Sequence, residues 1–185
     1  MICITVLDDI DQAALASLIT GYQSDYEYAV HWRDGAEQSS FSLTLRRRAH
    51  PYQKVFDRPD DEAFRQYNAA LPAGYSFGAF VAEQLVGVLL AEPRLWNQSV
   101  WVAEFHVATT YRGQGIGRRL MDALAKRAVS AGLRTLVCET QNTNVPAIQA
   151  YRRLGFQLEG VDLSYYTNQD YPAGEIALFM KRRLE

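Results

Sequence analysis

Hydrophobic and polar residues alternate along the chain with two different periods. Residues 41–45 alternate with the period of two that is typical of strands with one buried face, and β runs predict further strands over residues 2–7, 77–82, 85–91, 100–107, 134–140, 156–161 and 175–181. Apolar spacings of three and four predict helices over residues 12–19, 24–32, 60–71, 116–131 and 145–154. Residues 46–60 mix basic side chains, prolines and aromatics without a clear period, so no element is assigned to them.

The order of these elements predicts how the sheet is connected. Only Glu83-Gln84 separates two of the strands, so residues 77–91 are expected to form a hairpin. The strand at 100–107, a glycine-rich loop, a helix and the strand at 134–140 form a βαβ unit, whose two strands lie side by side and parallel. Without repeats or a low-complexity linker, the sequence predicts a single α+β domain around a mixed sheet.

Composition limits the class of protein and its compartment. The 185 residues are 48% hydrophobic, as in a globular domain. No apolar run approaches the roughly 20 residues of a membrane span, and the N-terminus lacks the basic region of a secretory signal. We therefore expect a cytoplasmic protein that does not bind membranes. Cys3 and Cys138 lie far apart and without metal-ligand spacing, so two buried, inert thiols and no metal are expected.

Charge is low overall but unevenly distributed. The formal net charge of −2 provides no basic surface for nucleic acid, so no nucleic-acid partner is expected. Residues 1–40 hold seven acids against a single arginine, Arg33, and three consecutive arginines, Arg46-Arg47-Arg48, follow. The acidic segment suits a cationic substrate, although a solvated surface explains it equally well.

The candidate chemistry begins at residues 111–118, Tyr-Arg-Gly-Gln-Gly-Ile-Gly-Arg, which join a strand to a helix. Glycines let the backbone turn sharply and approach a ligand, and the first N–H groups of the helix can bind an anion. Arg112 can add charge-assisted contacts. The loop lacks the Lys-Ser/Thr of a P-loop, and no acidic residue follows where a dinucleotide-binding fold has its ribose ligand. The segment therefore predicts a site for another phosphate-bearing ligand.

Two segments, in this order, resemble the GCN5-related N-acetyltransferase (GNAT) superfamily. Residues 112–117 are similar to its acetyl-CoA pyrophosphate loop, and Asn144, Ala147, Tyr151 and Gly155-Phe156 are similar to the helix and strand beside the pantetheine and thiol. The resemblance implies an α/β sandwich: a mixed, mostly antiparallel central sheet with a splayed parallel pair and helices on both faces. It implies acetyl-CoA as the cosubstrate, with binding residues Phe105, His106, Val107, Arg112, Gly113, Gln114, Gly115, Ile116, Gly117, Arg118, Asn144, Ala147 and Tyr151.

A more specific resemblance, over residues 75–180, is to streptothricin acetyltransferases. The matching residues are Trp96-Asn97, 139–142, Gly160-Val161-Asp162, Tyr165-Tyr166 and 175–179. Those proteins usually carry two adjacent acids where this chain has Ala103-Glu104. The first 70 residues show no such match and are expected to contain much of the acceptor site. The expected layout is one domain, residues 1–185, with an acceptor-side region at 1–70 and an acetyl-CoA-binding core at 75–181.

The resemblance implies direct attack of an amine on the acetyl thioester, which requires a base and an acid. Glu104 is the preferred base because it lies on the strand that leads into the glycine loop; alternatively it pairs with a basic residue or binds the acceptor's cation. Its rivals are Glu83, Glu139 and Asp162. Tyr151 is the candidate acid for the departing thiolate, or else a core tyrosine.

Backbone groups and one amide complete the implied cofactor site. N–H groups near residues 105–107 are expected to polarise the acetyl carbonyl and to pair with the pantetheine arm. Asn144 either binds the pantetheine or serves only as a helix cap. His106 is expected to lie on the opposite strand face from Glu104, unable to pair with it, and is interpreted as structural.

An aromatic and acidic wall is the candidate acceptor site. Tyr22, Tyr26, Tyr28 and Trp32, interleaved with Asp25 and Glu27, could hold a cation, although helix packing explains them equally well. Tyr165 and Tyr166 could complete that wall. The substrate-binding candidates are thus Tyr26, Trp32, Glu104, Glu139 and Tyr165.

Three functions fit these observations. The leading one is acetyl-CoA-dependent acetylation of a primary amine on a cationic small molecule, with streptothricin as the substrate and antibiotic resistance as the result. A second is acetylation of another amine: an aminoglycoside, a polyamine, a protein N-terminus or a lysine. A third is a CoA-binding partner protein without turnover. Members of this superfamily often dimerise through C-terminal strands, so a homodimer is also considered.

Overall fold

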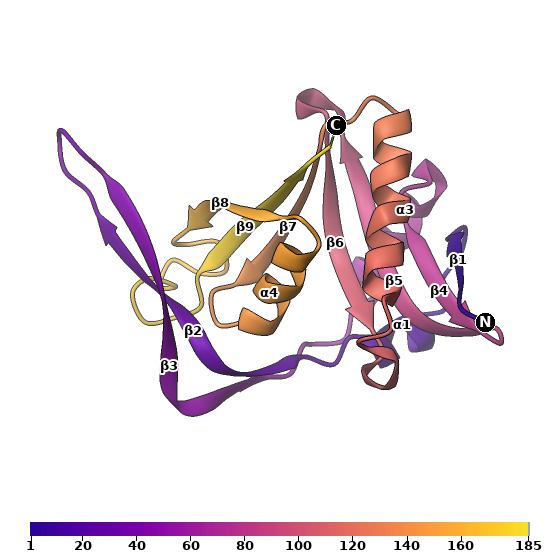
Figure 1. The fold of residues 1–185 in the computed structure, drawn as a ribbon, viewed down its shortest axis with the longest axis horizontal. Coiled ribbons are helices and arrows are strands. Elements are labelled where there is room, and N and C mark those ends of the chain that lie inside the picture. Colours follow the sequence, from indigo (N-terminus) through magenta and orange to yellow (C-terminus); the bar gives the residue numbers. More distant parts are fainter. Residues whose placement is uncertain (185) are drawn as a thin grey trace. The chain divides into compact units, whose positions relative to one another are not determined.

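A computed structural model describes residues 1–184, which form two compact units (Figure 1). The first unit contains residues 1–20, 56–138 and 182–184, and the second contains residues 21–55 and 139–181. Strand β7 (Thr135–Gln141) contributes its first residues to the first unit and its last residues to the second. Within residues 1–184, no helix combines the length and the apolar character that a bilayer crossing requires.

The first unit is built on antiparallel strands with one parallel pair at its edge. Its strands lie in the order β1 (Cys3–Val6), β4 (Phe77–Val81), β5 (Gln84–Arg94), β6 (Ser99–Val107) and β7. All neighbours are antiparallel except β6 and β7, which are parallel. The expected hairpin of β4 and β5 is confirmed, and so is the expected parallel pair. The turn residues Ala82 and Glu83 have positive φ angles, as a two-residue hairpin turn requires.

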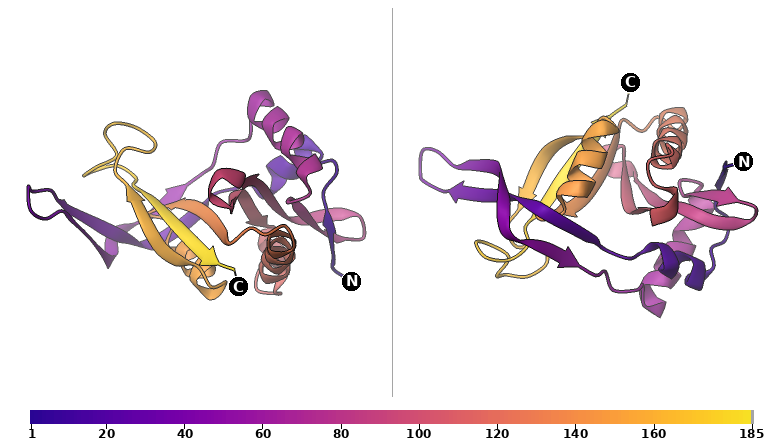
Figure 2. Two further views of the ribbon diagram at one scale, coloured as in Figure 1. Left: turned by 90° about the horizontal axis from the view of Figure 1, so that it is seen from above. Right: turned by 60° about the horizontal axis from the view of Figure 1, so that its bottom comes forward.

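Helices cover both faces of the sheet in the first unit, as Figure 2 shows. They are α1 (Gln12–Leu18), α2 (Asp61–Ala70) and α3 (Ile116–Ser130), with the single turns η1 (Leu71–Ala73), η2 (Leu95–Asn97) and η3 (Thr109–Tyr111). Val88 and Leu90 of β5 pack into the apolar cluster of α1. Gly87, which precedes Val88 and points to the opposite face, faces Ile116 and Leu120 of α3. Successive residues of β5 thus point alternately to the layer of α1 and to the layer of α3.

The second unit combines a long hairpin with a helix and two strands. Strands β2 (Tyr22–Arg33) and β3 (Ser40–Lys54) pair antiparallel with each other. Helix α4 (Val145–Arg153) begins at its cap Asn144, and β8 (Gln157–Asp162) pairs antiparallel with β9 (Ala177–Arg183). The Tyr28 N–H donates to the Asn142 carbonyl, and Tyr151, Ile148 and Val145 bury one face of α4.

Two expectations about the N-terminal third were wrong or incomplete. Residues 24–32 form part of strand β2, not a helix. Tyr26, Tyr28, Val30 and Trp32 recur every second position, and aromatic and β-branched residues favour strands, so the period of two was the informative one. The unassigned residues 46–54 continue β3. Cys138 is buried as expected, whereas Cys3 is exposed, because β1 is an edge strand.

Candidate active site

Strand β6 separates from β7 at a bulge. Its parallel pairing with β7 covers Ser99–Val102 and ends there. On its other side, Leu90 of β5 is opposite Glu104 while Ala91 is opposite Val102, so Ala103 is the extra, bulged residue. A bulge bends its strand and increases its twist. The splayed parallel pair expected from the sequence is therefore present, and it opens at the residue before Glu104.

The glycine loop has the backbone geometry of an anion site. Gly113 and Gly115 have φ angles of +76° and +78°, which residues with side chains rarely adopt. A Cβ atom on either residue would meet nothing within 4 Å, so the space in front of the loop is open. Gly115 caps α3 without a side-chain hydrogen bond, and the first N–H groups of the helix remain available to a ligand. The loop fits a pyrophosphate.

Two polar side chains of the loop already bond to backbone. Arg112 Nε donates to the Val107 carbonyl over 3.0 Å, and Gln114 Nε2 donates to the Thr110 carbonyl over 3.2 Å. The first bond ties the loop to the end of β6, and the second ties it to η3. Ile116, fully buried, fixes the start of α3 against the sheet. Phosphate contacts from Arg112, Gln114 and Arg118 stay predictions.

Glu104 and His106 share one strand face and contact each other, so the expectation that they lie on opposite faces was wrong. His106 Nε2 lies 2.6 Å from Glu104 Oε2. Residues two apart in a strand point the same way, so the spacing itself predicts this contact. Their partners across the ladder are Val88 and Leu90, so both side chains point to the α1 and α2 layer.

Tyr67 completes this cluster from α2 and was missed by the sequence analysis. Its hydroxyl donates to Glu104 Oε1 over 2.7 Å. Burial, and then the neighbouring Glu104 carboxylate, raise the pKa of Tyr67 well above its ordinary value, so the phenol stays protonated as a donor. Phe56 packs its ring edge to face with His106, with ring centres 6.2 Å apart. The clue in the sequence was only the placement of Tyr67 on an amphipathic helix.

The residues assigned to the pantetheine and thiol lie on α4 in the second unit. Tyr151 is buried, and its ring centre lies 5.4 Å from that of Phe156. Asn144 is buried and accepts from the Ala147 N–H over 3.2 Å, which confirms the helix cap. The same side-chain amide of Asn144 would have to serve both as the helix cap and as a ligand contact. Cofactor binding by Asn144, Ala147 and Tyr151 therefore stays a prediction.

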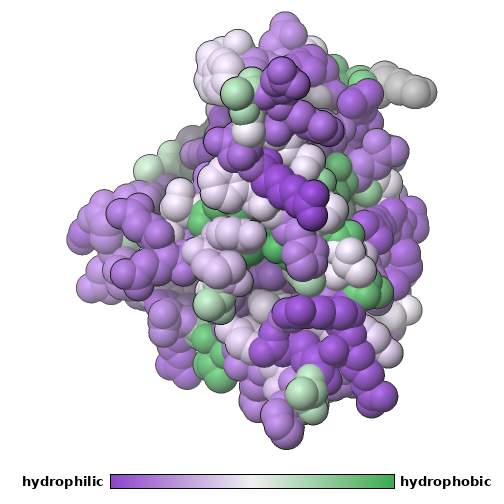
Figure 3. Space-filling view, turned by 90° about the vertical axis from the view of Figure 1, so that its left-hand side faces the viewer, coloured by the Kyte–Doolittle hydropathy of each residue, from purple (hydrophilic) through white to green (hydrophobic). Residues whose placement is uncertain are grey.

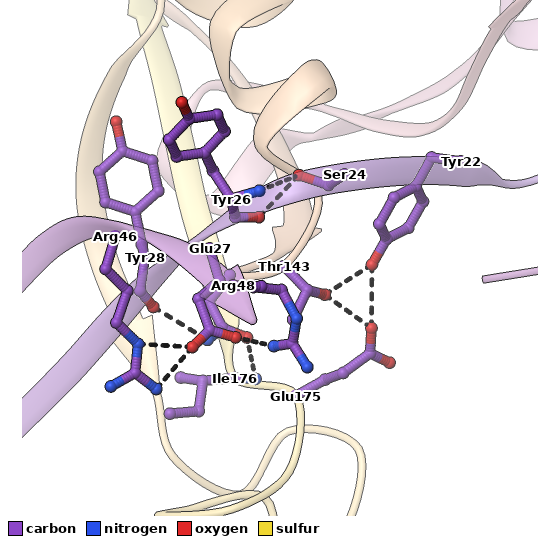
Figure 4. Close-up of polar contacts among 11 residues, drawn as sticks. Tyr22, Ser24, Tyr26, Glu27, Tyr28, Arg46, Arg48, Thr143, Glu175 and Ile176 are labelled. Carbon is purple, nitrogen blue, oxygen red and sulfur yellow. Dashed lines mark hydrogen bonds and ion pairs between the residues drawn. The ribbon is translucent and has the colours of Figure 1, made fainter. Parts of the chain in front are cut away.

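Charged side chains of the β2–β3 hairpin neutralise each other (Figure 4). Glu27, which is buried, accepts from Arg46 Nε over 2.6 Å and forms a second ion pair with Arg48. Glu27 and Arg46 are direct cross-strand partners in the register. The acidic character expected for this segment is thus offset by the arginines that follow it. Glu27 is not a free carboxylate for a cationic substrate.

Glu175 is the centre of a second polar network of this unit. Its carboxylate accepts from Tyr22 and Thr143 hydroxyls, 2.9 Å in each case, and pairs with Lys54 (Figure 4 shows the two hydroxyls). Burial alone would raise the pKa of Glu175, but these hydrogen bonds and the Lys54 charge lower it overall. The same burial raises the pKa of Tyr22 far above its ordinary range.

The candidate acceptor residues are only partly brought together. Tyr166 donates to Glu139, and Tyr165 lies edge to face with Tyr166 at 5.3 Å between ring centres. Burial raises the pKa of Glu139, although Tyr166 and Lys54 oppose the shift. Trp32 packs against Tyr171 instead, with ring centres 5.9 Å apart, and Tyr26 is exposed.

A cavity of about 730 Å³ opens in the second unit between the hairpin and the segment before β9. Its charged and polar lining comprises Glu27, His31, Arg46, Arg47, Arg48, His50, Tyr52, Asn142, Thr143 and Glu175. Recognising residues 24–32 as a strand would have placed Glu27 beside Arg46 and revealed half of this lining. Within residues 1–184, no group of three or more His, Cys, Asp or Glu side chains is arranged to hold a metal ion.

Comparisons with known proteins agree with this geometry. A model of the Acetyltransferase (GNAT) family matches residues 42–156, more than half of the chain. The chain is 32% identical over 153 residues to streptothricin acetyltransferase of Escherichia coli, covering 82% of this chain and 79% of that protein. It is 37% identical over 134 residues to streptothricin acetyltransferase of Streptomyces lavendulae, covering 70% and 69%. It is also 30% identical to the ribosomal protein bS18 alanine N-acetyltransferase of Escherichia coli strain K12, covering 71% and 82%.

Solved structures show the same architecture. The crystal structure of nourseothricin acetyltransferase superposes with a TM-score of 0.75 at 30% identity, covering 100% of this chain and 98% of that one. A Bacillus anthracis protein solved with acetyl coenzyme A shares the fold with a TM-score of 0.77 at 20% identity, covering 100% and 99%. The fold and the glycine loop define an acyltransferase of the acetyl-CoA-dependent type. The chain belongs to the GNAT family of acetyltransferases.

Proposed function

We propose that this enzyme transfers an acetyl group from acetyl-CoA to a primary amine of streptothricin and thereby confers resistance to it. The observation that carries the proposal is the parting of β6 from β7 at Ala103, beside a glycine-capped helix. Similarity to two streptothricin acetyltransferases over most of the chain supports the choice of acceptor. Acetylation removes a positive charge and the donor geometry of an ammonium group.

The residues of the glycine loop are suited to hold the cofactor. Gly113, Gly115 and the first N–H groups of α3 bind the pyrophosphate, because the loop is open and the helix end has no side-chain cap. Backbone N–H groups of residues 105–107 pair with the pantetheine arm where β6 has left β7. When bound, acetyl-CoA supplies an activated thioester and a leaving thiolate.

The chain's own side chains move the protons. Glu104 accepts a proton from the acceptor ammonium, since it stands at the bulge, is half-buried and faces the α1 and α2 layer. Tyr151 lends its phenolic proton to the thiolate. Asn144 and Ala147 bind the pantetheine from the start of α4. We place the acetyl-CoA core at residues 75–181 of one catalytic domain, 1–185, and the acceptor-side region at 1–70.

The acceptor is bound as a cation next to carboxylate and aromatic side chains. In the second unit, such groups are offered by the carboxylate of Glu139 and by the rings of Tyr165, Trp32 and Tyr26. The face in Figure 3 is mostly hydrophilic with scattered hydrophobic residues, which suits a polar acceptor. Because acetyl-CoA is a cytoplasmic metabolite, we place the enzyme in the cytoplasm.

A second acceptor class has its own support. Thirty per cent identity to an N-acetyltransferase of a ribosomal protein, over 71% of this chain, favours a protein N-terminus. The same proton transfers by Glu104 and Tyr151 would serve either amine. The two proposals differ only in the surface that selects the acceptor.

The experiment is thiol release from acetyl-CoA with purified protein. Streptothricin is compared with an aminoglycoside, spermidine, a lysine peptide and a peptide with an N-terminal alanine. Turnover with streptothricin alone supports the proposal, and turnover with the alanine peptide alone supports the second candidate. No turnover with any amine, together with binding of acetyl-CoA in calorimetry, would contradict enzymatic function and favour a CoA-binding partner protein.

A further inference from the structure

Both oxygens of the Glu104 carboxylate are held by neighbouring side chains. Tyr67 donates to Oε1 over 2.7 Å, and His106 Nε2 lies 2.6 Å from Oε2. The side chains of Glu104 and His106 are 21% and 15% exposed, so this cluster is largely buried but still reached by solvent. A carboxylate with two donors keeps further lone pairs for an incoming proton, but it loses its freedom to rotate.

We infer that His106 is a positioning residue for Glu104, whose carboxylate it holds in the orientation in which Glu104 accepts a proton from the amine. The inference rests on the proposed function and deepens it. It assigns a role to a residue that the sequence analysis interpreted as merely structural. The evidence for this role is the contact between His106 and Glu104, not similarity to other proteins.

The tautomer of His106 follows from the contact. A carboxylate can only accept, so the 2.6 Å contact needs a proton on Nε2 when Glu104 is ionised. A neutral ring with hydrogen on Nε2 gives Glu104 one oriented hydrogen bond and leaves its charge available. A ring protonated on both nitrogens adds a full positive charge, which favours the ionised carboxylate over its protonated form. The neutral ring is therefore the form in which Glu104 accepts a proton.

Apolar and aromatic side chains surround the Glu104–His106 contact. From α2, Tyr67 faces Glu104, and Asp60 at the start of that helix acts electrostatically on Tyr67. From β5, the facing residues Val88 and Leu90 are apolar. Phe56 packs against the imidazole itself.

The catalytic step conserves protons. The acceptor ammonium gives one proton to a Glu104 oxygen, and the neutral amine then attacks the acetyl carbonyl. The C–N bond forms as the C–S bond of the thioester breaks, Tyr151 protonates the departing thiolate, and the second proton lost by the nitrogen restores the Tyr151 phenol. Glu104 returns the first proton to water before the next turnover, while the proton on His106 Nε2 stays in place. His106 exchanges no proton with the substrate, so it positions Glu104 rather than reacting itself.

The kinetic test compares the pH profiles of kcat/KM for wild type, His106→Gln and His106→Leu. Glutamine still donates to Glu104 but cannot become charged. We expect His106→Gln to keep kcat/KM within about 10-fold of wild type at about pH 8, because its amide still donates to Glu104. His106→Leu is expected to fall by a further factor of about 10, with the KM for acetyl-CoA unchanged, because Glu104 loses its orientation.

A matched variant tests the other donor to the same carboxylate. Tyr67→Phe removes the donor to Oε1, so its kcat is expected to fall while the KM for acetyl-CoA is unchanged. A kcat of His106→Leu equal to that of wild type would overturn the inference.

A spectroscopic test needs neither substrate nor turnover. In protein labelled with ¹⁵N at histidine, we expect His106 alone to show a strongly hydrogen-bonded Nε2–H tautomer, which Glu104→Gln weakens. The signals of His31 and His50 should not move. Hydrogen on Nδ1 of neutral His106 would overturn the inference. If the tautomer is as expected but no amine is acetylated, the proposed function fails, and the role inferred for His106 in catalysis fails with it.

Discussion

A Cβ atom on Gly117 would lie 3.0 Å from Cζ of Phe105, so the start of α3 touches the strand that carries the candidate base. We predict that Gly117→Ala displaces the ring and costs about 1–3 kcal/mol, partly offset by about 1 kcal/mol of helix propensity. Gly117→Trp should prevent acetyl-CoA binding, because its side chain cannot share the space of Phe105 and must enter the pyrophosphate approach. Calorimetric titration with acetyl-CoA measures this.

A tryptophan elsewhere on the same helix is the control. Ser130→Trp places it at the exposed far end of α3, where acetyl-CoA binding should be unaffected. Equal affinity of Gly117→Trp and wild type for acetyl-CoA would show that the loop does not bind the cofactor.

Replacing Glu104 by glutamine keeps the shape of the side chain and removes the proton acceptor. Turnover is expected to fall by about 100-fold or more, with the acidic limb of the pH–rate profile lost. The affinity for acetyl-CoA should hardly change, since Glu104 faces the α1 and α2 layer whereas the glycine loop begins α3. An unchanged acidic limb would assign the base to another carboxylate or to water.

Removing the phenol of Tyr151 tests the acid. Tyr151→Phe keeps the ring contact with Phe156 and the buried face of α4. We expect turnover to drop by about 10-fold or more, while the Kd of acetyl-CoA stays close to that of wild type. Full turnover across the pH range would identify Tyr151 as a core tyrosine only.

The parts of the fold with one dominant period were predictable. Helix α3 buries Ile116, Leu120, Leu124 and Ala128 at helical spacing, as expected, and ends near Gly132. Asn144 and Asp60 are caps, as their residue types indicate. These signals are local, so a sequence can carry them without knowledge of tertiary contacts.

The errors arose where two signals compete or where contacts are distant in sequence. Tyr28 and Trp32 are four positions apart, as in a helix, but they also belong to the period of two of a strand, and pairing with β3 favours the strand. The strand period alone predicts the contact between Glu104 and His106, but the sequence prediction placed the two residues on opposite faces. Tyr67, by contrast, reaches Glu104 from 37 positions away, and nothing in either segment alone indicates it.

The two arginines bound to Glu27 should contribute unequally to stability. The side chain of Arg48 is 30% exposed and that of Arg46 is 62% exposed. Water therefore screens Arg46 more effectively, and Arg46→Met should cost less than about 1 kcal/mol. Arg48→Met should cost about 1.5–3 kcal/mol, because the hydrogen bond that Arg48 donates to the buried carboxylate is less screened by water. Urea denaturation compares the variants, and equal losses would contradict this ranking.

The pKa shifts of Glu139 and Glu175 predict opposite effects of pH on the two glutamine variants. Burial raises the pKa of Glu139, so its contribution to stability is fully present at low pH and is lost as pH rises through its folded-state pKa. Glu139→Gln should therefore be more stable than wild type at about pH 7, with the difference vanishing towards about pH 4. The glutamine oxygen still accepts from Tyr166, so the variant and wild type differ mainly in the ionisable group.

Glu175 has the reverse sign. Its pKa is lowered despite burial, because Lys54, Thr143 and Tyr22 favour the carboxylate. Its contribution is present above the unfolded-state pKa and is lost as pH falls through the folded-state pKa, so Glu175→Gln should be destabilised at about pH 7 and approach wild type in acid. Urea denaturation of both variants between about pH 4 and 7 makes the measurement. Parallel stability curves for the two variants would mean that these carboxyl groups do not differ in their folded environments.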